Sequence, residues 1–150
     1  MQTLLQSRKH PSYDADLMLW IDAQIQLLLD RRFSELDIET LVAELDGMKK
    51  RELRALKNRL RVLVMHLLKC QFQPVHPKNR WRATVIEQRE RLAMLLEDSP
   101  SLRAALAEYA HQIYPVAVRM ASAKTGLPIN GFPADNPYSV AQILDQDFMP

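Results

Sequence analysis

No proline interrupts the chain between residues 16 and 73, although nine prolines occur among its 150 residues. An interior proline removes a backbone N–H and clashes with the preceding turn, so its absence over such a length permits long helices. Glycine is also rare, with three in the chain: Gly47, Gly126 and Gly131. Few glycines and many Leu, Ala, Arg, Glu and Gln favour helices over a sheet of many hairpins. The sequence therefore predicts an all-α fold.

Apolar residues recur at helical spacing in five segments, which predicts helices at about 14–31, 35–47, 48–72, 80–98 and 100–125. Leu17, Trp20, Ile21, Ile25 and Leu28 form one face of the first helix, and Ile38, Leu41, Val42 and Leu45 form one face of the second. Gly47 marks a break or kink between the second and third helices. Pro74 and Pro77 stop the third helix, Ser99 caps the fifth, and Pro115 kinks it.

The C-terminal residues read as a proline-rich strap. Ser139 and Gln142 form a capping box for a short sixth helix at about 140–145. Five large apolar side chains would anchor the strap: Phe132, Tyr138, Ile143, Leu144 and Phe148. The predicted architecture is a single bundle of five to six helices over residues 13–150, preceded by a flexible lead-in at 1–12.

Charge is distributed unevenly along the chain. Residues 1–48 hold 4 basic and 9 acidic side chains, a net charge of −5, and residues 49–91 hold 13 basic and 3 acidic, a net charge of +10. Residues 92–150 hold 3 basic and 6 acidic, a net charge of −3. A basic middle between acidic flanks fits either a polyanion site or an internal contact between acidic and basic elements.

Four cations at spacings of 4, 3 and 4 lie on one face of the helix predicted over 48–72, and we call them the basic stripe: Lys50, Arg54, Lys57 and Arg61. Such a row would follow the phosphates of a nucleic-acid backbone, with Arg80 and Arg82 extending it. The alternative is a solvated face, or pairing with acids such as Glu39, Glu44 and Asp46. The sequence favours this alternative, because no recognised DNA-binding motif accompanies the stripe.

A second set of polar residues falls in or near the predicted core, and we call it the polar cluster: Glu44, His66, Lys69, Gln88 and Arg89. Buried polar groups need partners, which here would be acids such as Glu44, backbone carbonyls or water. The cluster is either a small polar pocket or, as we favour, a network that orients helices. Burial predicts that His66 is neutral at pH 7, holds one fixed hydrogen bond and has a lowered pKa.

Several kinds of chemistry lack their sequence signatures. The single cysteine, Cys70, excludes an internal disulfide and a multi-cysteine zinc site. No Gly-rich phosphate loop and no nucleophile elbow occurs. We therefore predict no metal, no cofactor and no catalytic residue. No segment approaches the roughly 20 apolar residues of a membrane span, and residues 1–12 lack the apolar core of a signal peptide. We expect a cytoplasmic protein with no membrane contact.

A combination of short motifs runs along the chain: Tyr13-Asp14-Ala15-Asp16 with Trp20, Arg32-Phe33-Ser34-Glu35-Leu36-Asp37, His66-Leu67-Leu68-Lys69, Trp81-Arg82-Ala83-Thr84, Ser99-Pro100-Ser101-Leu102, Phe132-Pro133 and Pro137-Tyr138. Together they resemble the bacterial domain-of-unknown-function family 29 over about residues 13–150. The resemblance implies an all-helical fold and implies no activity, because the family has none assigned.

These patterns favour a small bacterial helical protein that acts by binding a protein partner or by forming a homo-oligomer. The first alternative is a nucleic-acid-binding accessory protein that uses the basic stripe. The second alternative is an enzyme of unrecognised type.

Overall fold

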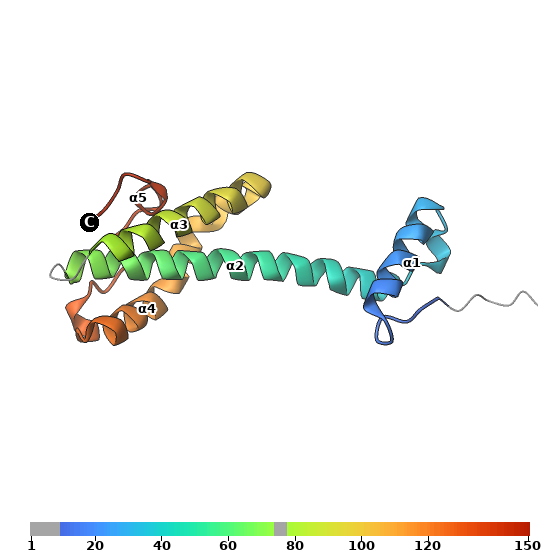
Figure 1. Cartoon of the computed structure of the whole chain (residues 1–150), viewed down its shortest axis with the longest axis horizontal. Helices are drawn as coiled ribbons and strands as arrows, with labels where there is room; N and C mark the ends of the chain where they lie inside the picture. Colours follow the sequence, from blue (N-terminus) through green and yellow to red (C-terminus); the bar gives the residue numbers. More distant parts are fainter. Residues whose placement is uncertain (1–9, 74–77) are drawn as a thin grey trace, which may run out of the picture. The chain divides into compact units, whose positions relative to one another are not determined.

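The computed structural model describes residues 10–73 and 78–150 (Figure 1). This part of the chain is all-α, as predicted, and contains no strand. In order, its elements are α1 (Leu17–Leu29), the 3-10 helix η1 (Phe33–Glu35), α2 (Ile38–Phe72), α3 (Lys78–Asp98), η2 (Pro100–Ala105), α4 (Leu106–Thr125), η3 (Ile129–Gly131) and α5 (Val140–Leu144). Most of the flexible lead-in predicted for 1–12 lies outside the described residues.

The described residues form two compact units, one up to residue 50 and one from residue 51 onward, and the boundary between them falls within α2. We call the described part of the first, residues 10–50, the N-terminal unit, and the second the C-terminal bundle. The single domain proposed for residues 13–150 stays a prediction.

The N-terminal unit begins its two helices with aspartate caps. The Asp16 side chain accepts a hydrogen bond from the backbone N–H of Leu19 at 3.0 Å, and α1 ends at Leu29, close to the predicted bounds. Asp37 caps α2 in the same way, accepting from the N–H of Thr40 at 3.3 Å. Such caps satisfy backbone N–H groups that have no partner within the helix.

The helix α2 continues through Gly47, so the prediction of a separate helix over 35–47 is wrong. Glycine inside a helix costs only about 1 kcal/mol relative to alanine, and the neighbouring Leu, Met, Glu and Lys residues are good helix formers. With no proline nearby, the hydrogen-bond ladder continues to Phe72. Pro74 and Pro77, which were predicted to stop the helix, lie outside the described residues.

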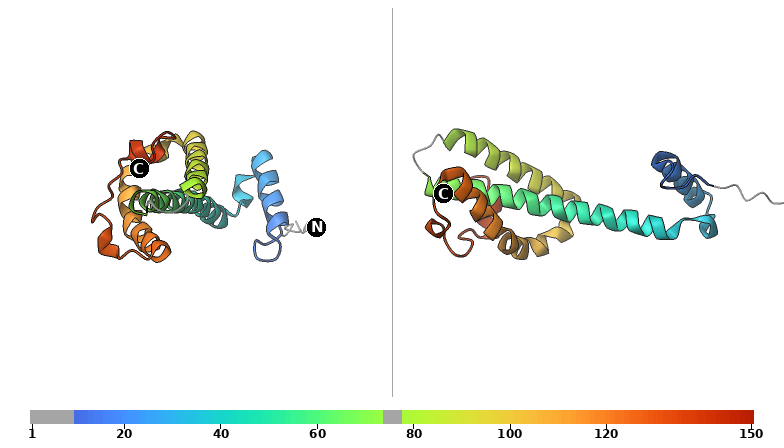
Figure 2. Two further views of the ribbon diagram at one scale, coloured as in Figure 1. Left: turned by 60° about the vertical axis from the view of Figure 1, so that its left-hand side comes forward. Right: turned by 90° about the horizontal axis from the view of Figure 1, so that it is seen from below.

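The C-terminal bundle packs α3 and α4 against the second part of α2, which runs between them (Figures 1 and 2). The stretch of α2 from Leu63 to Leu68 is almost fully buried, as its apolar sequence predicts, and His66 is half-buried. The buried leucines and valines of these helices form one core: Leu56, Leu60, Leu63, Val64, Leu67, Leu68, Val85, Leu92, Leu96, Leu106 and Val118.

The helix predicted to begin at Pro100 starts differently from the prediction. Pro100–Ala105 form the 3-10 helix η2, the α-helix begins at Leu106, and the Ser99 side chain makes no capping hydrogen bond. Instead the Ser99 carbonyl accepts from the Leu102 N–H at 3.0 Å, the tighter bond of a 3-10 turn. The helix α4 then continues across Pro115, where the kink stays a prediction, and ends at Gly126 with φ 75°.

The C-terminal strap is ordered on the bundle, as predicted. Phe132, Tyr138 and Ile143 are buried, and Leu144 and Phe148 pack against the core. The capping box at the start of α5 is present, with both reciprocal hydrogen bonds between Ser139 and Gln142. These contacts give the strap the apolar anchors that its sequence predicts.

Candidate interaction surface

The N-terminal unit exposes most of its large apolar side chains. Trp20, Gln24 and Leu27 are its buried residues among those described. Eleven others are 43–72% exposed, and we call them the apolar surface: Leu17, Met18, Leu19, Ile25, Leu28, Leu29, Phe33, Ile38, Val42, Leu45 and Met48. The C-terminal bundle is longer, yet exposes three such residues in its described part: Ile86, Met94 and Ile129. Exposed apolar area in this amount is typical of sites that bind a partner.

The sequence signals the apolar surface, because α1 contains more apolar residues than a single buried face requires. The helical pattern predicts one apolar face for α1, but Met18, Leu19 and Leu29 fall outside it. At 100° per residue they spread apolar side chains around most of the helix, away from buried Trp20 and Leu27. A helix that is apolar on nearly every side needs neighbours on more than one side. Most of the apolar residues from which the first two helices are predicted are therefore exposed on the surface of this unit.

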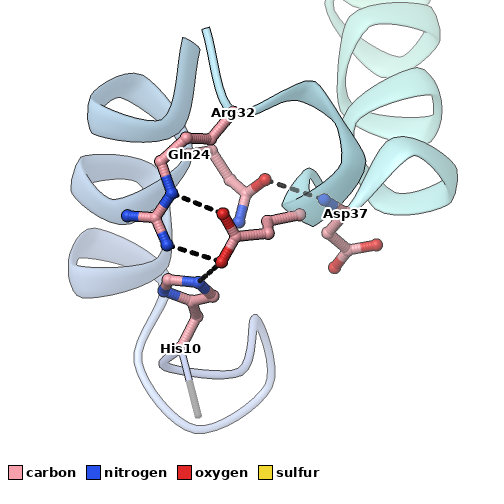
Figure 3. Close-up of polar contacts among 5 residues, drawn as sticks. His10, Gln24, Arg32 and Asp37 are labelled. Atoms are coloured by element: carbon pink, nitrogen blue, oxygen red, sulfur yellow. Dashed lines mark hydrogen bonds and ion pairs between the residues drawn. The ribbon is translucent and has the colours of Figure 1, made fainter. Parts of the chain in front are cut away.

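Polar contacts fix the segment between α1 and α2. The Gln24 side-chain oxygen accepts from the backbone N–H of Asp37 at 2.9 Å (Figure 3). The Trp20 indole N–H donates to the Asp37 carboxylate at 3.1 Å. The hydroxyl of Tyr13, whose ring stacks edge-on with that of Trp20, donates to Glu44. These bonds join α1, the connection and the start of α2 into one ordered unit.

A charged group braces the same connection. Arg32 binds Glu35 through two guanidinium nitrogens, one at 2.6 Å, and the His10 ring lies 3.6 Å from the same carboxylate (Figure 3). The hydrogen bond from Arg32 is the main cause that lowers the pKa of Glu35. The hydrogen bond from Thr40 likewise lowers the pKa of Asp37. Several polar contacts therefore hold the connection between the two helices, α1 and α2, that present most of the apolar surface.

The members of the basic stripe have different surroundings. Lys50 forms an ion pair with Asp46, one turn earlier on the same helix, at 2.6 Å, which is one of the two alternatives to a phosphate contact at this position. In the C-terminal bundle, Arg54 is exposed, and the Lys57 ammonium lies 4.5 Å from the centre of the Tyr109 ring. Arg61 is half-buried, and its Nε has no hydrogen-bond partner.

The two arginines that would extend the stripe, Arg80 and Arg82, are both exposed on α3. Within residues 10–73 and 78–150, no ion pair joins Arg54, Lys57 or Arg61 to a carboxylate. A role of these cations in binding nucleic acid stays a prediction.

The residues of the polar cluster have separate partners. Glu44 accepts from Tyr13 within the N-terminal unit. In the C-terminal bundle the Lys69 ammonium lies 4.4 Å from the centre of the Trp81 ring, and Gln88 is half-buried. Arg89 is 1% exposed and donates to three backbone carbonyls of the strap. Backbone carbonyls were one of the three kinds of partner predicted for the buried polar groups, and they are the partners of Arg89.

The surroundings of His66 are positive. Burial is the main cause that lowers its pKa to about 4, and the ammonium groups of Lys69 and Lys124 add to the shift. His66 is therefore neutral at pH 7, as predicted. The predicted fixed hydrogen bond does not form at Nδ1, which is buried without a partner. Burial is also the main cause that lowers the pKa of Lys69, and the charge of Lys124 adds to that shift.

The described residues show no metal site and no membrane-spanning helix, and they contain one sizeable groove. They contain no group of three His, Cys, Asp or Glu side chains arranged to hold a metal ion, and Cys70 is buried. None of their helices combines the length and apolarity that crossing a bilayer requires. An open, mainly apolar groove of about 770 Å³ lies between α4 and the strap, beside Tyr114, Val118 and Phe132.

Comparison with known proteins places the chain in a family. No curated protein and no solved structure matches it. The family model described as "Domain of unknown function DUF29" matches residues 12–149. Since this match spans both units of the chain, and agrees with the motifs that run from Tyr13 to Tyr138, the protein belongs to the DUF29 family.

Proposed function

We propose that this protein is a non-catalytic interaction protein that binds another protein chain through the apolar surface of its N-terminal unit. The observation that carries the proposal is the contrast within one chain. The described part of the C-terminal bundle exposes only three of its large apolar residues, whereas the N-terminal unit, although shorter, exposes eleven. Each square ångström of apolar area that a partner covers contributes about 25 cal/mol, so this surface is a strong driving force for association.

The composition of the surface supports the same proposal. Leucine, isoleucine, methionine and phenylalanine supply its apolar part, and exposed carboxylates such as Asp22, Asp30 and Glu39 lie near it. An apolar centre with a polar rim is the usual organisation of a protein–protein interface. The polar contacts around Asp37 hold the surface in one conformation, which lowers the entropy cost of binding.

Site-specific photo-cross-linking in cells tests the proposal. A photoreactive residue placed at Leu29 or Leu45 is expected to give one discrete cross-linked species, because both side chains would be covered by the partner. The matched control is Met94, an equally exposed apolar side chain on α3, which is expected to give none. Equal cross-linking at all three positions, or none at any, would contradict the proposal.

Nucleic-acid binding is the second candidate function. The observation that favours it is that Arg54, Lys57 and Arg61 share one face of α2, and no ion pair within the described residues neutralises them. Cations in such a row would follow a phosphate backbone and would release counterions on binding.

The salt dependence of binding to a short DNA duplex tests this candidate. At about 50 mM salt we expect binding that weakens steeply as salt is added. Arg54→Glu with Lys57→Glu is expected to abolish it, while Arg103→Glu, an exposed arginine on η2, leaves most of it. Fluorescence anisotropy of a labelled duplex measures the affinity. Undetectable binding of the wild-type protein at low salt would exclude the candidate.

A further inference from the structure

We infer that the chain covering the apolar surface is a second copy of this protein, so that two α1 and two α2 helices share one core. The inference rests on the proposed function and names the partner. Three properties of the N-terminal unit support a second copy as the partner: its incomplete core, the spacing of its apolar residues and the position of its charges.

The N-terminal unit has too little core for its helices. Of its three buried side chains, one is the polar Gln24, so Trp20 and Leu27 are its buried apolar residues among those described. An amphipathic helix must bury its apolar stripe against another element. Units of about 40 residues usually need a metal, disulfides or oligomerisation to be stable. Doubling the unit supplies the missing layer without any further component.

The spacing on α2 suits packing against an identical helix. Ile38, Leu41, Leu45 and Met48 follow one another at intervals of 3, 4 and 3, the spacing of core positions in paired helices. None of these four positions carries a charge. In a twofold dimer each patch meets its own copy, so one patch suffices, and such dimers are the commonest protein oligomers. A different partner would have to provide a second matching pattern.

The charged side chains of the unit lie outside these four apolar positions of α2. Two of its carboxylates are already neutralised within the unit, Glu35 by Arg32 and Asp46 by Lys50. The remaining acidic groups include Asp22, Asp30 and Glu39, all exposed, where salt screens their mutual repulsion. The acidic excess therefore weakens a dimer at low salt but does not place charge in its core. A basic helix of another protein is the rival occupant, and it predicts the opposite response to salt.

Sedimentation equilibrium of the full chain tests the inference. We expect a mass of twice the 17.4 kDa chain at about 100 μM, and a dimer that tightens as salt rises from about 50 to 300 mM. Leu45→Glu is expected to weaken the dimer at least about a hundredfold, because each copy would bury a carboxylate. Met94→Glu is the matched control, since that exposed methionine lies on α3, and it is expected to leave the dimer unchanged.

A control for folding and a second substitution separate loss of the dimer from loss of the helices. Circular dichroism shows whether Leu45→Glu keeps its helices, and Ile38→Glu gives an independent second disruption at another of the four positions. A wild-type protein that is monomeric at about 100 μM overturns the inference. So does a dimer that withstands both substitutions. If the wild-type chain is monomeric while Leu45 cross-links to a different protein, the dimer fails but the proposed function stands.

Discussion

Replacing Arg89 by methionine is expected to destabilise the C-terminal bundle by roughly 3–5 kcal/mol. The guanidinium Nε donates to the carbonyl of Ile143 at 2.8 Å, Nη1 to that of Phe148 at 2.8 Å, and Nη2 to that of Gln142 at 3.0 Å. A hydrogen bond from a charged donor contributes about 1.5–3 kcal/mol, and an unpaired buried acceptor carries its full desolvation cost. Methionine fills similar space but supplies no donor.

The position of these carbonyls explains why one side chain has so large an effect. Gln142 and Ile143 lie near the end of α5, where backbone carbonyls have no partner within the helix. Arg89 takes the place of that missing turn and ties the strap to α3. Ile143 is 1% exposed, so loss of the bonds also uncovers an anchor of the core.

Urea unfolding compares Arg89→Met with Arg82→Met, an exposed arginine on the same helix, for which we expect a change within about 0.5 kcal/mol. Arg89→Lys should fall between them, because a lysine ammonium cannot reach three carbonyls in a planar fork. Hydrogen exchange should show loss of protection in α5 before the rest of the bundle. Equal unfolding free energies for the two methionine variants would contradict this account.

The elements that the sequence predicts correctly are those specified locally. The capping box of Ser139 and Gln142, the glycine at position 126 and the proline-free stretch each act within a few residues of themselves. Such signals do not depend on the rest of the fold. Gly47 shows the limit of the same reasoning, because a cost of about 1 kcal/mol does not end a helix whose neighbours favour it.

The candidate interaction surface could be predicted only in part. A periodic apolar face shows that Ile38, Leu41 and Leu45 share a side of a helix, but not whether an element of the same chain covers that side. Whether the face is covered depends on how many elements the unit contains, and no local sequence pattern indicates that number. The additional apolar residues Met18 and Leu29 were the available signal, because a solvent-facing helix side is normally polar.

For the polar cluster too, the sequence predicts that buried polar groups need hydrogen-bond partners but not which groups provide them. Burial of Arg89 beside the core predicts that it needs acceptors, yet those acceptors are more than 50 residues away along the chain. Glu44 was the acid expected to serve the cluster, and it accepts from Tyr13 instead. Composition and spacing predict that a buried polar group is satisfied, whereas the identity of its partner depends on tertiary packing.

Acid is expected to destabilise the wild-type protein through His66. Burial and the charges of Lys69 and Lys124 hold the pKa of His66 at about 4, below its ordinary value of 6.5. Between these values the unfolded chain binds a proton that the folded chain does not, so the free energy of unfolding falls as the pH falls from 6.5 to about 4. A shift of this size corresponds to about 3 kcal/mol. Because the ring is half-buried and partly screened by solvent, we expect roughly 1–2 kcal/mol.

The comparison of wild type with His66→Leu isolates this effect, since the carboxylates that also titrate in this range are common to both. Urea unfolding at pH 7 and pH 4.5 should show the smaller loss of stability in the leucine variant. The variant should be no less stable at pH 7, because Nδ1 of the wild-type ring is buried without a partner. His111→Gln, an exposed histidine on α4, should keep the wild-type response. An NMR titration in which the His66 ring gains its proton near pH 6.5, or an unchanged pH dependence in His66→Leu, would show that the neighbouring lysines and burial do not suppress its charge.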